Sequence, residues 1–408
     1  MVLDYSLLNP AALVVPAFFI FAGLEYVAAR RKKESSIFKF DSSVANMSIG
    51  LAERLLNLFL VASFYSIFQY LYEQHAFWDI PNTAWVWVVL ILTTDLVWYW
   101  YHRLGHEINL FWAAHIVHHQ SEEFNYTVSA RITVLQAIVR NVFWSILPLA
   151  GFHPGMVMIT LLIHGAYSFF THTQLIGRLG WLEYILITPS HHRVHHASNE
   201  KYINKNFGDL FVFWDKLFGT FQKEEEEPVY GLTHPLRSYS FMWQHFHYFM
   251  EVIHAVKLTP GLLNKLRIIF GKPEMLDQSI RPELEKMYLP NRKNGLHTQR
   301  RHRVYLIFQI AIASVIVFLL MLLYRQIPLS ELIAGTLFVI ITLVNCGALM
   351  EQRRWIYYLE YIRLLTVTGY LSDHFDNPYI FAGSLIFVVV AIWPLQKWYL
   401  RIIYHPYE

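Results

Sequence analysis

The chain has 408 residues, of which 55% are hydrophobic, 17% aromatic and 15% charged. Soluble proteins of this length carry more charge and fewer apolar residues, so the composition indicates a membrane protein whose partner is lipid. The net charge of +3 is too small, and the basic residues too scattered, for a nucleic-acid-binding protein. The single cysteine, Cys346, excludes an intrachain disulfide and a thiolate zinc site, so a metal must be bound by histidine and carboxylate.

Apolar segments recur along the chain at lengths near the 20 or so residues that a helix needs to cross ~30 Å of hydrocarbon. We expect membrane spans near residues 9–29, 55–73, 83–101, 305–324, 332–350, 356–371 and 379–396. Residues 139–172 form an apolar hairpin that turns near GFHPG, with Arg140 at its entrance, and it either crosses fully or re-enters. The first segment lacks a basic start and a small-residue cleavage pattern, so we expect an anchor rather than a signal peptide.

Basic residues between the spans predict the orientation, because short loops rich in Lys and Arg stay on the cytoplasmic side. Residues 30–39 are rich in them, whereas the loop after the second span has none. Residues 102–130 and 173–303 are then expected at the cytoplasmic ends of the spans. The predicted fold class is all-α, a polytopic transmembrane helical bundle with a histidine-rich helical cap on its cytoplasmic side, in a bacterial inner membrane or the endoplasmic reticulum.

Three histidine motifs lie in those two stretches. An HxxxH motif and two HxxHH motifs contain, in order, His102, His106, His115, His118, His119, His192, His195 and His196. Residues three or four apart share a helix face, with Cβ atoms about 5–6 Å apart, so each motif can direct imidazoles at one point. Eight imidazoles exceed what one ion binds, and imidazole suits iron, zinc or copper, so two metal ions with about four histidines each are expected. A lone histidine is usually a hydrogen-bonded surface or core residue, but three spaced motifs on one side of a membrane favour metal binding.

The third span adds a carboxylate to this pattern. Asp95, Tyr99, His102 and His106 fall on one helical stripe. A carboxylate inside a span costs about 2.5–3.5 kcal/mol unless it has a partner, which makes Asp95 a functional candidate. We interpret Asp95 as an acceptor for the N–H of a ligand imidazole, which would fix the orientation of that ring. The alternative is that Asp95 only pairs with a neighbouring span.

These motifs resemble the integral-membrane fatty acid hydroxylase and sterol desaturase superfamily. Residues 188–221, TPSHHRVHHASNEKYINKNFGDLFVFWDKLFGTF, are similar to its C-terminal signature, and HEINLFWAAHIVHHQSEEFNYTVSARITVLQ and YGLTHPL to its alkylglycerol monooxygenase branch. The resemblance covers residues 40 to 250 or so. It implies a non-haem di-iron oxygenase that uses O2 to attack an unactivated lipid C–H bond, with hydroxylation leading to ether-lipid cleavage in that branch.

The resemblance also assigns roles to single residues. It makes the eight motif histidines the metal ligands and adds one histidine from the hairpin, where His164 and His172 are candidates and His172, nearer the cytoplasmic end, is preferred. It matches Glu107 to a glutamate of the branch that supports the site, with a solvated helix-end acid as the equal alternative. His234 matches the branch as well, with a structural loop role equally open, and His191 just ahead of the last motif stays open. The implied cofactors are two iron ions, O2 and tetrahydrobiopterin or another external reductant.

Four parts are expected along the chain. They are an N-terminal membrane anchor (1–39), a catalytic domain (40–250), a basic membrane-surface linker (251–303) and C-terminal transmembrane helices of unknown role (304–408). Basic residues of the linker suit anionic headgroups, and an electron-donor protein is the alternative partner. Two other functions stay open: a sterol or fatty acyl hydroxylase or desaturase that uses a separate electron-transfer protein and, remotely, a metal transporter, whose ligands would lie nearer the membrane midplane.

Overall fold

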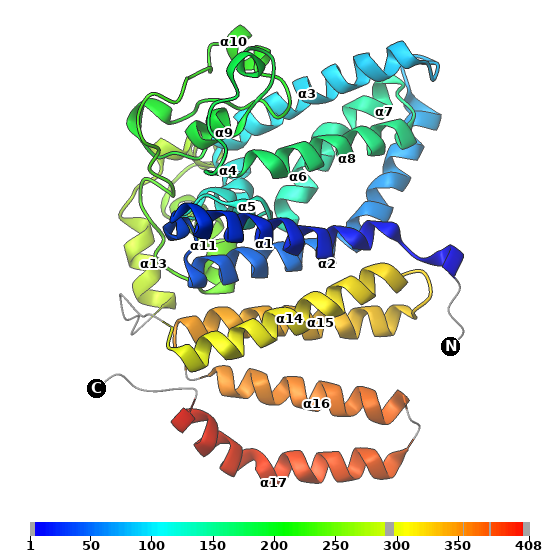
Figure 1. Cartoon of the computed structure of the whole chain (residues 1–408), viewed down its shortest axis with the longest axis vertical. Helices are drawn as coiled ribbons and strands as arrows, with labels where there is room; N and C mark the ends of the chain where they lie inside the picture. The colour runs from blue at the N-terminus through cyan, green and yellow to red at the C-terminus, as the bar shows by residue number, and fades with distance from the viewer. Residues whose placement is uncertain (1–4, 290–297, 354, 375–376, 403–408) are drawn as a thin grey trace.

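The computed structural model describes residues 5–289, 298–353, 355–374 and 377–402. This part of the chain is all-α, with two isolated β-bridges and no sheet among the described residues. Long helices run side by side through most of the molecule (Figure 1). They are α1 (Val14–Lys32), α2 (Phe40–His75), α3 (Ala84–Glu107), α8 (Pro154–Thr171), α14 (Arg300–Leu323), α15 (Leu329–Met350), α16 (Ile356–His374) and α17 (Pro378–Ile402).

Six helices of the described part are long and apolar enough to cross a membrane. They are Pro10–Lys32, which extends α1 by a 3-10 turn, and α2, α3, α8, α14 and α15. Five of them coincide with predicted spans, and α8 is the second half of the predicted hairpin. The expected all-α, multi-pass membrane bundle is therefore confirmed. Helices α16 and α17 form where spans were predicted but are not among the six, and α16 carries Glu360 and Arg363 in its sequence.

Helix α2 is longer than the predicted span within it. At 36 residues it extends about 54 Å, well beyond the thickness of the hydrocarbon. The sequence predicts only its apolar second half, whereas the first half, from Ser42 to Leu55, is largely buried against the rest of the protein. Glu53 lies near the end of this buried stretch, and its Oε1 is 3.9 Å from Nη2 of Arg140, the residue predicted at the hairpin entrance.

The predicted hairpin turns between α7 (Ile146–Ala150) and α8, at Gly151. Gly151 has a φ of 109°, and a Cβ there would lie 2.0 Å from the Trp78 carbonyl oxygen, so only glycine fits. His153 then caps α8 by accepting from the Gly155 N–H at 3.1 Å, and Pro154 occupies the first helical position. The arm before the turn consists of two helices, α6 (Val134–Trp144) and α7, with Ser145 between them, whereas the arm after it is the single helix α8.

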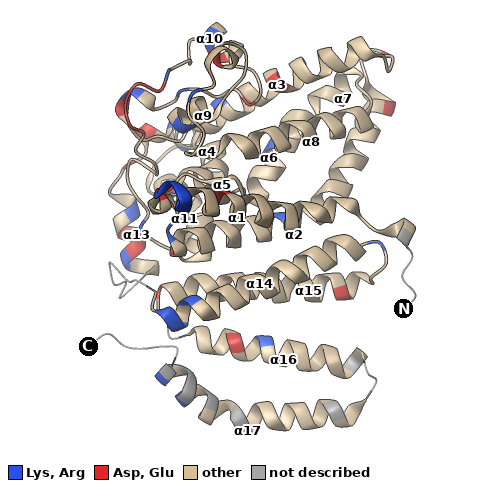
Figure 2. Cartoon of the chain, viewed as in Figure 1, with Lys and Arg blue, Asp and Glu red and all other residues tan. Residues whose placement is uncertain are grey.

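A set of mostly short helices gathers at one end of the bundle, which we call the cap (Figure 1). They are α4 (Asn109–His115), α5 (Tyr126–Ser129), α9 (Pro189–His195), α10 (Phe213–Leu217), α11 (Phe241–Leu258), α12 (Leu262–Phe270) and α13 (Ile280–Tyr288). Lys, Arg, Asp and Glu residues concentrate at the same end and are sparse along the long helices (Figure 2). Burying the long helices in lipid therefore leaves the cap as the polar end of the molecule.

A buried apolar cluster fixes the cap helices beneath the histidine motifs. It includes Val117 from the 3-10 helix Ile116–His119, Trp243 and Val252 from α11, and Leu284 from α13. Val117 is fully buried, and it stands inside the HxxHH motif, directly before His118. Packing of Val117 holds the motif against α11. The histidines of the motif then point away from α11.

Candidate metal centre

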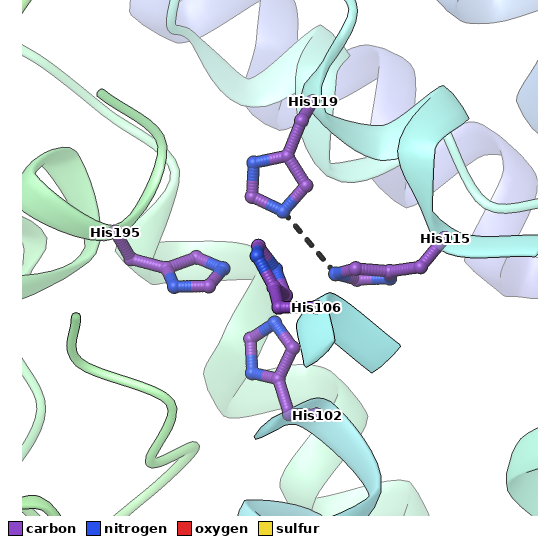
Figure 3. A group of neighbouring side chains, drawn as sticks. All are labelled: His102, His106, His115, His119 and His195. Carbon is purple, nitrogen blue, oxygen red and sulfur yellow. Dashed lines mark hydrogen bonds between the residues drawn. The ribbon is translucent and has the colours of Figure 1, made fainter. Parts of the chain in front are cut away.

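Five imidazoles converge where α3 ends, and Figure 3 shows their rings directed toward a common space. One nitrogen from each ring lies within 4.8 Å of those of the others. Nε2 of His115 and Nε2 of His119 are 3.2 Å apart. We call this the first histidine group, and its members are His102, His106, His115, His119 and His195.

Four further imidazoles form a second histidine group beside the first. Its members are His118, His172, His192 and His196, all buried, with one nitrogen of each within 4.8 Å of the others. Nε2 of His172 is 3.2 Å from Nε2 of His118 and 3.0 Å from Nε2 of His192. The hairpin histidine preferred from the sequence, His172, is therefore the one that joins a group.

The rings of the two groups are in direct contact. His119 of the first group stacks on His196 of the second, with ring centroids 4.4 Å apart and an interplanar angle of 26°. His118 lies beside both, with centroids 5.4 Å from His119 and 4.6 Å from His196. Two ions held by the two groups would therefore be neighbours within one dinuclear centre.

Each HxxHH motif divides its histidines between the groups, which differs from the prediction that one motif serves one point. Of the first motif, His115 and His119 enter the first group and His118 the second. Of the second motif, His195 enters the first group, and His192 and His196 the second. The reason is helical geometry, because residues four apart share a face while consecutive residues point about 100° apart.

The ring nitrogens are arranged for binding metal ions rather than for hydrogen bonding to one another. The Nε2 atoms of His102, His106, His195 and His196 are buried and have no hydrogen-bond partner within the described chain. Buried polar atoms without partners are rare in folded proteins. Two nitrogens bound at about 2.1 Å to one ion and at right angles to each other are about 3.0 Å apart, close to the 3.0 and 3.2 Å found in the second group. Both groups can therefore hold a metal ion.

Burial keeps the imidazoles in the neutral form that binds metal. Burial, followed by repulsion from neighbouring histidines, lowers the pKa of His118, His119 and His196 well below its usual value. The pKa of His172 falls to about 4 for the same first reason, although its Nδ1–H donates to the Ser168 carbonyl at 2.8 Å. A neutral ring keeps one lone pair free, so no proton has to leave before a metal ion is bound.

Two backbone carbonyls orient the first group, and the sequence did not predict either. His195 Nδ1 donates to the Lys205 carbonyl at 3.0 Å, and His102 Nδ1 donates to the Phe207 carbonyl at 2.9 Å. Both bonds place the hydrogen on Nδ1 and direct Nε2 into the group. Every residue type offers a carbonyl, so the only signal in the sequence is the glycine that follows, Gly208, which marks a close backbone approach.

Asp95 lies below the histidines rather than among them. Its Oδ1 and Oδ2 accept from the backbone N–H groups of Leu210 and Phe211, at 2.9 and 3.0 Å. The predicted bond to a ligand imidazole is not found among the described residues. Asp95 precedes His102 by seven residues, which is about 10.5 Å along the helix axis and beyond the reach of a carboxylate.

His164, the other hairpin candidate, belongs to a different cluster. Its Nδ1 is 2.7 Å from Oδ2 of Asp209 and 3.6 Å from Oδ1 of Asp95, and all three side chains are buried. The sequence pointed to His164 through its spacing from His172 but gave no signal for Asp209, which lies far along the chain.

Three other candidates from the sequence lie outside both groups. Glu107 accepts from Arg103 Nε at 2.9 Å at the end of α3. His191 is part of the N-terminal cap of α9, where its Nδ1 accepts from the Thr188 N–H at 3.3 Å. His234 is exposed.

Arg193 joins the elements that carry the second group. Its Nε and Nη2 donate to the two carboxylate oxygens of Glu224 at 2.7 and 2.6 Å. Its Nη1 donates to the carbonyls of Thr173 and Ile176 at 3.1 and 2.8 Å. Because Arg193 follows His192 and Thr173 follows His172, the guanidinium ties the backbones of two members of the group together.

Comparison with known proteins gives a consistent result. A family model described as fatty acid hydroxylase matches residues 87–220, which contain both histidine groups. The chain is 33% identical to alkylglycerol monooxygenase of Homo sapiens over 86% of this chain and 80% of that protein. It is 30% identical to alkylglycerol monooxygenase of Danio rerio, over 94% and 88%, and 30% identical to ornithine lipid hydroxylase OlsE of Rhizobium tropici, over 37% and 46%. No solved structure matches the chain.

Proposed function

The chain belongs to the alkylglycerol monooxygenase family, and we propose that it is an iron-dependent membrane monooxygenase that hydroxylates ether lipids and so cleaves them. The observation that carries the proposal is the pair of adjacent all-histidine groups at the cap end of the spans. Side chains alone cannot attack an unactivated C–H bond by acid–base chemistry, whereas a redox-active metal with access to O2 supplies the oxidising power.

In the proposed reaction, one oxygen atom of O2 enters the C–H bond beside the ether oxygen. The other leaves as water, with two electrons and two protons from an external reductant. The hydroxylated carbon is then a hemiacetal, whose C–O bond to glycerol breaks to give an aldehyde and a free glycerol hydroxyl. Hydroxylation is the step that needs the metal centre.

The nine histidines have defined tasks in this proposal. The first and second groups would each hold one iron ion, and their burial excludes water from the ligands. The carbonyls of Lys205 and Phe207 hold His195 and His102 with Nε2 directed inward. Arg193 holds the backbones beside His172 and His192 in register. Pre-organised ligands of this kind keep two ions at fixed separation.

The lipid substrate would reach the site from the bundle's lipid-facing side while its headgroup stays near the cap. The cap would then face the cytoplasm, at a bacterial inner membrane or the endoplasmic reticulum, and the Lys- and Arg-rich loops between the spans support this orientation. Helix α12 supports a surface position for the 251–303 linker, because its Leu262, Leu263, Leu266 and Phe270 are exposed beside Lys265 and Arg267. Such a helix suits a membrane interface with anionic headgroups.

The electrons would come from tetrahydrobiopterin or another external reductant, with an electron-donor protein as the alternative. Family resemblance supports the pterin. A second candidate function is hydroxylation of an acyl chain without cleavage, and the similarity to an ornithine lipid hydroxylase supports lipid hydroxylation in general. The two functions differ in product, since ether cleavage releases an aldehyde and acyl hydroxylation does not.

The test is turnover by iron-loaded, detergent-purified protein with an alkylglycerol, O2 and either tetrahydrobiopterin or a ferredoxin-type donor. Fatty aldehyde that requires O2, and that a matched ester-linked lipid does not yield, is the expected product. A hydroxylated acyl chain without aldehyde would favour the second function. Absence of any O2-dependent product from iron-loaded protein with both donors would contradict the oxygenase proposal.

A further inference from the structure

The segment from Lys205 to Phe211 contacts the first histidine group through backbone atoms. The Lys205 and Phe207 carbonyls accept from His195 and His102, at 3.0 and 2.9 Å. Both bonds are made by Nδ1, and the Nε2 atoms of the two rings are buried and have no hydrogen-bond partner in the described part of the chain. The position of one short segment therefore sets the orientation and the tautomer of two of the five rings in the group.

Two buried carboxylates hold this segment by its N–H groups. Asp215 accepts from Phe207 N and Gly208 N at 2.7 and 2.8 Å. Asp95 accepts from Leu210 N and Phe211 N at 2.9 and 3.0 Å. Both carboxylates have an exposure of 0%. Four backbone donors within five consecutive residues are thus bound by two acceptors that cannot exchange them for water.

Asp215 and Asp95 are themselves anchored to spans and to the rest of the loop. Asp215 Oδ1 accepts from Thr220 Oγ1 at 2.7 Å, and Thr220 Oγ1 is 3.0 Å from the Tyr99 hydroxyl of α3. Asp95 is part of α3 itself. A Cβ at Gly208 would lie 2.9 Å from Asp215 Oδ2, so the backbone passes too close to this carboxylate for a side chain.

The residue between the two pairs of donors is bound as well. The Asp209 side chain lies 2.7 Å from His164 Nδ1, which attaches the segment to α8. The residues before and after Asp209 are attached to α3, through Asp215 and through Asp95. These attachments leave the Phe207 carbonyl little freedom to move relative to α3, the helix that carries His102.

We propose that Asp215 and Asp95 are positioning residues for the first histidine group, in which they clamp the Phe207–Phe211 segment so that the Phe207 carbonyl fixes the His102 ring. The inference rests on the proposed function, because it takes the first group as a metal site. The clamp acts on the first group alone, since the rings of the second group make no hydrogen bond to this segment among the described residues. Weakening the clamp should therefore lower the affinity for one metal ion and leave the affinity for the other unchanged.

The variant Asp215→Asn tests the clamp with little change in shape. An amide has one acceptor oxygen instead of two, so one of the Phe207 and Gly208 N–H groups would face an NH2 group. Loss of partners that orient a ligand usually costs about 10–100-fold in metal affinity. The matched control is Glu251→Gln in α11, a carboxylate with 4% exposure that is bound to Arg281 rather than to either histidine group.

The measurement is anaerobic loading of the full chain in detergent with ferrous iron, followed by competition with a chelator. We expect Asp215→Asn to release one of two iron ions about 10–100-fold more readily, with the other retained as in the wild type and in Glu251→Gln. Combined with His192→Ala, which damages the second group, Asp215→Asn should keep its full effect. Combined with His102→Ala it should add little, because the ring through which it acts is gone.

Several results would overturn the inference. One is a folded Asp215→Asn protein that retains both ions as tightly as the wild type. Another is equal weakening of both sites together with a lower unfolding temperature, which would show a general structural role. If Asp215→Asn does not fold, Asp95→Asn provides the same test at the other end of the clamp, and failure of both to fold would assign the carboxylates to the fold instead. A wild-type chain that binds no iron would contradict the proposed function itself.

Discussion

Nε2 of His172 lies 3.0 Å from Nε2 of His192, although the first residue follows the helix α8 and the second belongs to α9. This contact brings the end of the apolar hairpin to the last histidine motif and completes a group of four rings. His164, eight residues earlier and within α8, pairs with Asp209 instead. The hairpin thus contributes its final residue, and not its middle, to the proposed metal centre.

His172→Ala should therefore remove one bound metal ion, because three remaining rings hold the second site poorly. His191→Gln is the matched control: it stands next to a proposed ligand, and glutamine keeps an acceptor for the Thr188 N–H at the start of α9. Metal content per chain, measured on folded protein, should fall only in His172→Ala. Equal metal content in both variants would remove His172 from the site.

His119→Ala and His195→Ala should each lower turnover by more than about 100-fold, since each removes a proposed ligand rather than a residue that orients one. Membrane insertion should be unaffected, because neither residue lies in a span. His254→Ala, a partly exposed histidine of α11 that belongs to neither group, is the control. Full activity in His119→Ala or His195→Ala would exclude that residue from the centre.

Glu224→Gln should destabilise the protein near neutral pH but not in acid. Burial alone would raise the pKa of Glu224, but hydrogen bonds from Arg193 and Ser190 outweigh it and hold the pKa below the ordinary 4.5. A carboxylate with a lowered pKa contributes stability that is complete above its unfolded pKa and is lost as the pH falls through the folded one. We expect a cost of about 2 kcal/mol at pH 7.

Thermal unfolding in detergent at a series of pH values measures this difference. The gap between wild type and Glu224→Gln should narrow as the pH falls below about 4.5, where Glu224 of the unfolded wild-type chain takes up a proton, and should close below the lower pKa of the folded state. A gap that stays constant into acid would show that the Arg193–Glu224 pair does not contribute through charge.

Gly151→Ala should destabilise the hairpin. The residue has a φ of 109°, and its added Cβ would meet the Trp78 carbonyl oxygen at 2.0 Å, so backbone must move. We expect a loss of about 2–4 kcal/mol in the free energy of unfolding. Gly165→Ala in α8, where a Cβ would meet nothing within 4 Å, should change stability by less than about 1 kcal/mol. Similar unfolding temperatures for the two variants would contradict the proposed role of Gly151.

Much of the fold follows from the sequence because membrane spans are decided by local composition. The apolar runs of α1, α3, α14 and α15 and the turn at Gly151 all lie where the sequence places them. The buried first half of α2 does not, because its apolar and polar residues face protein rather than lipid, and only tertiary packing reveals that.

The candidate site is also predictable from the sequence only in part. Spacing identifies the eight motif histidines as a set, and helical geometry explains afterwards why His118 and His119 face different groups. The acceptors that orient the rings, such as the Phe207 carbonyl, are backbone atoms brought from a distant loop. Spacing alone suggests that Asp95 binds a ligand imidazole directly, because it says nothing about the 207–211 segment, whose N–H groups bind Asp95 instead.

The proposed function requires that the two histidine groups hold two iron ions. Elemental analysis of detergent-purified chain, expressed with iron supplied, tests it most directly when the wild type is compared with a variant in which His118, His119, His195 and His196 are changed to Ala. We expect about two iron ions per wild-type chain and their loss in the variant. Zinc in place of iron, or metal that survives the four substitutions, would contradict it.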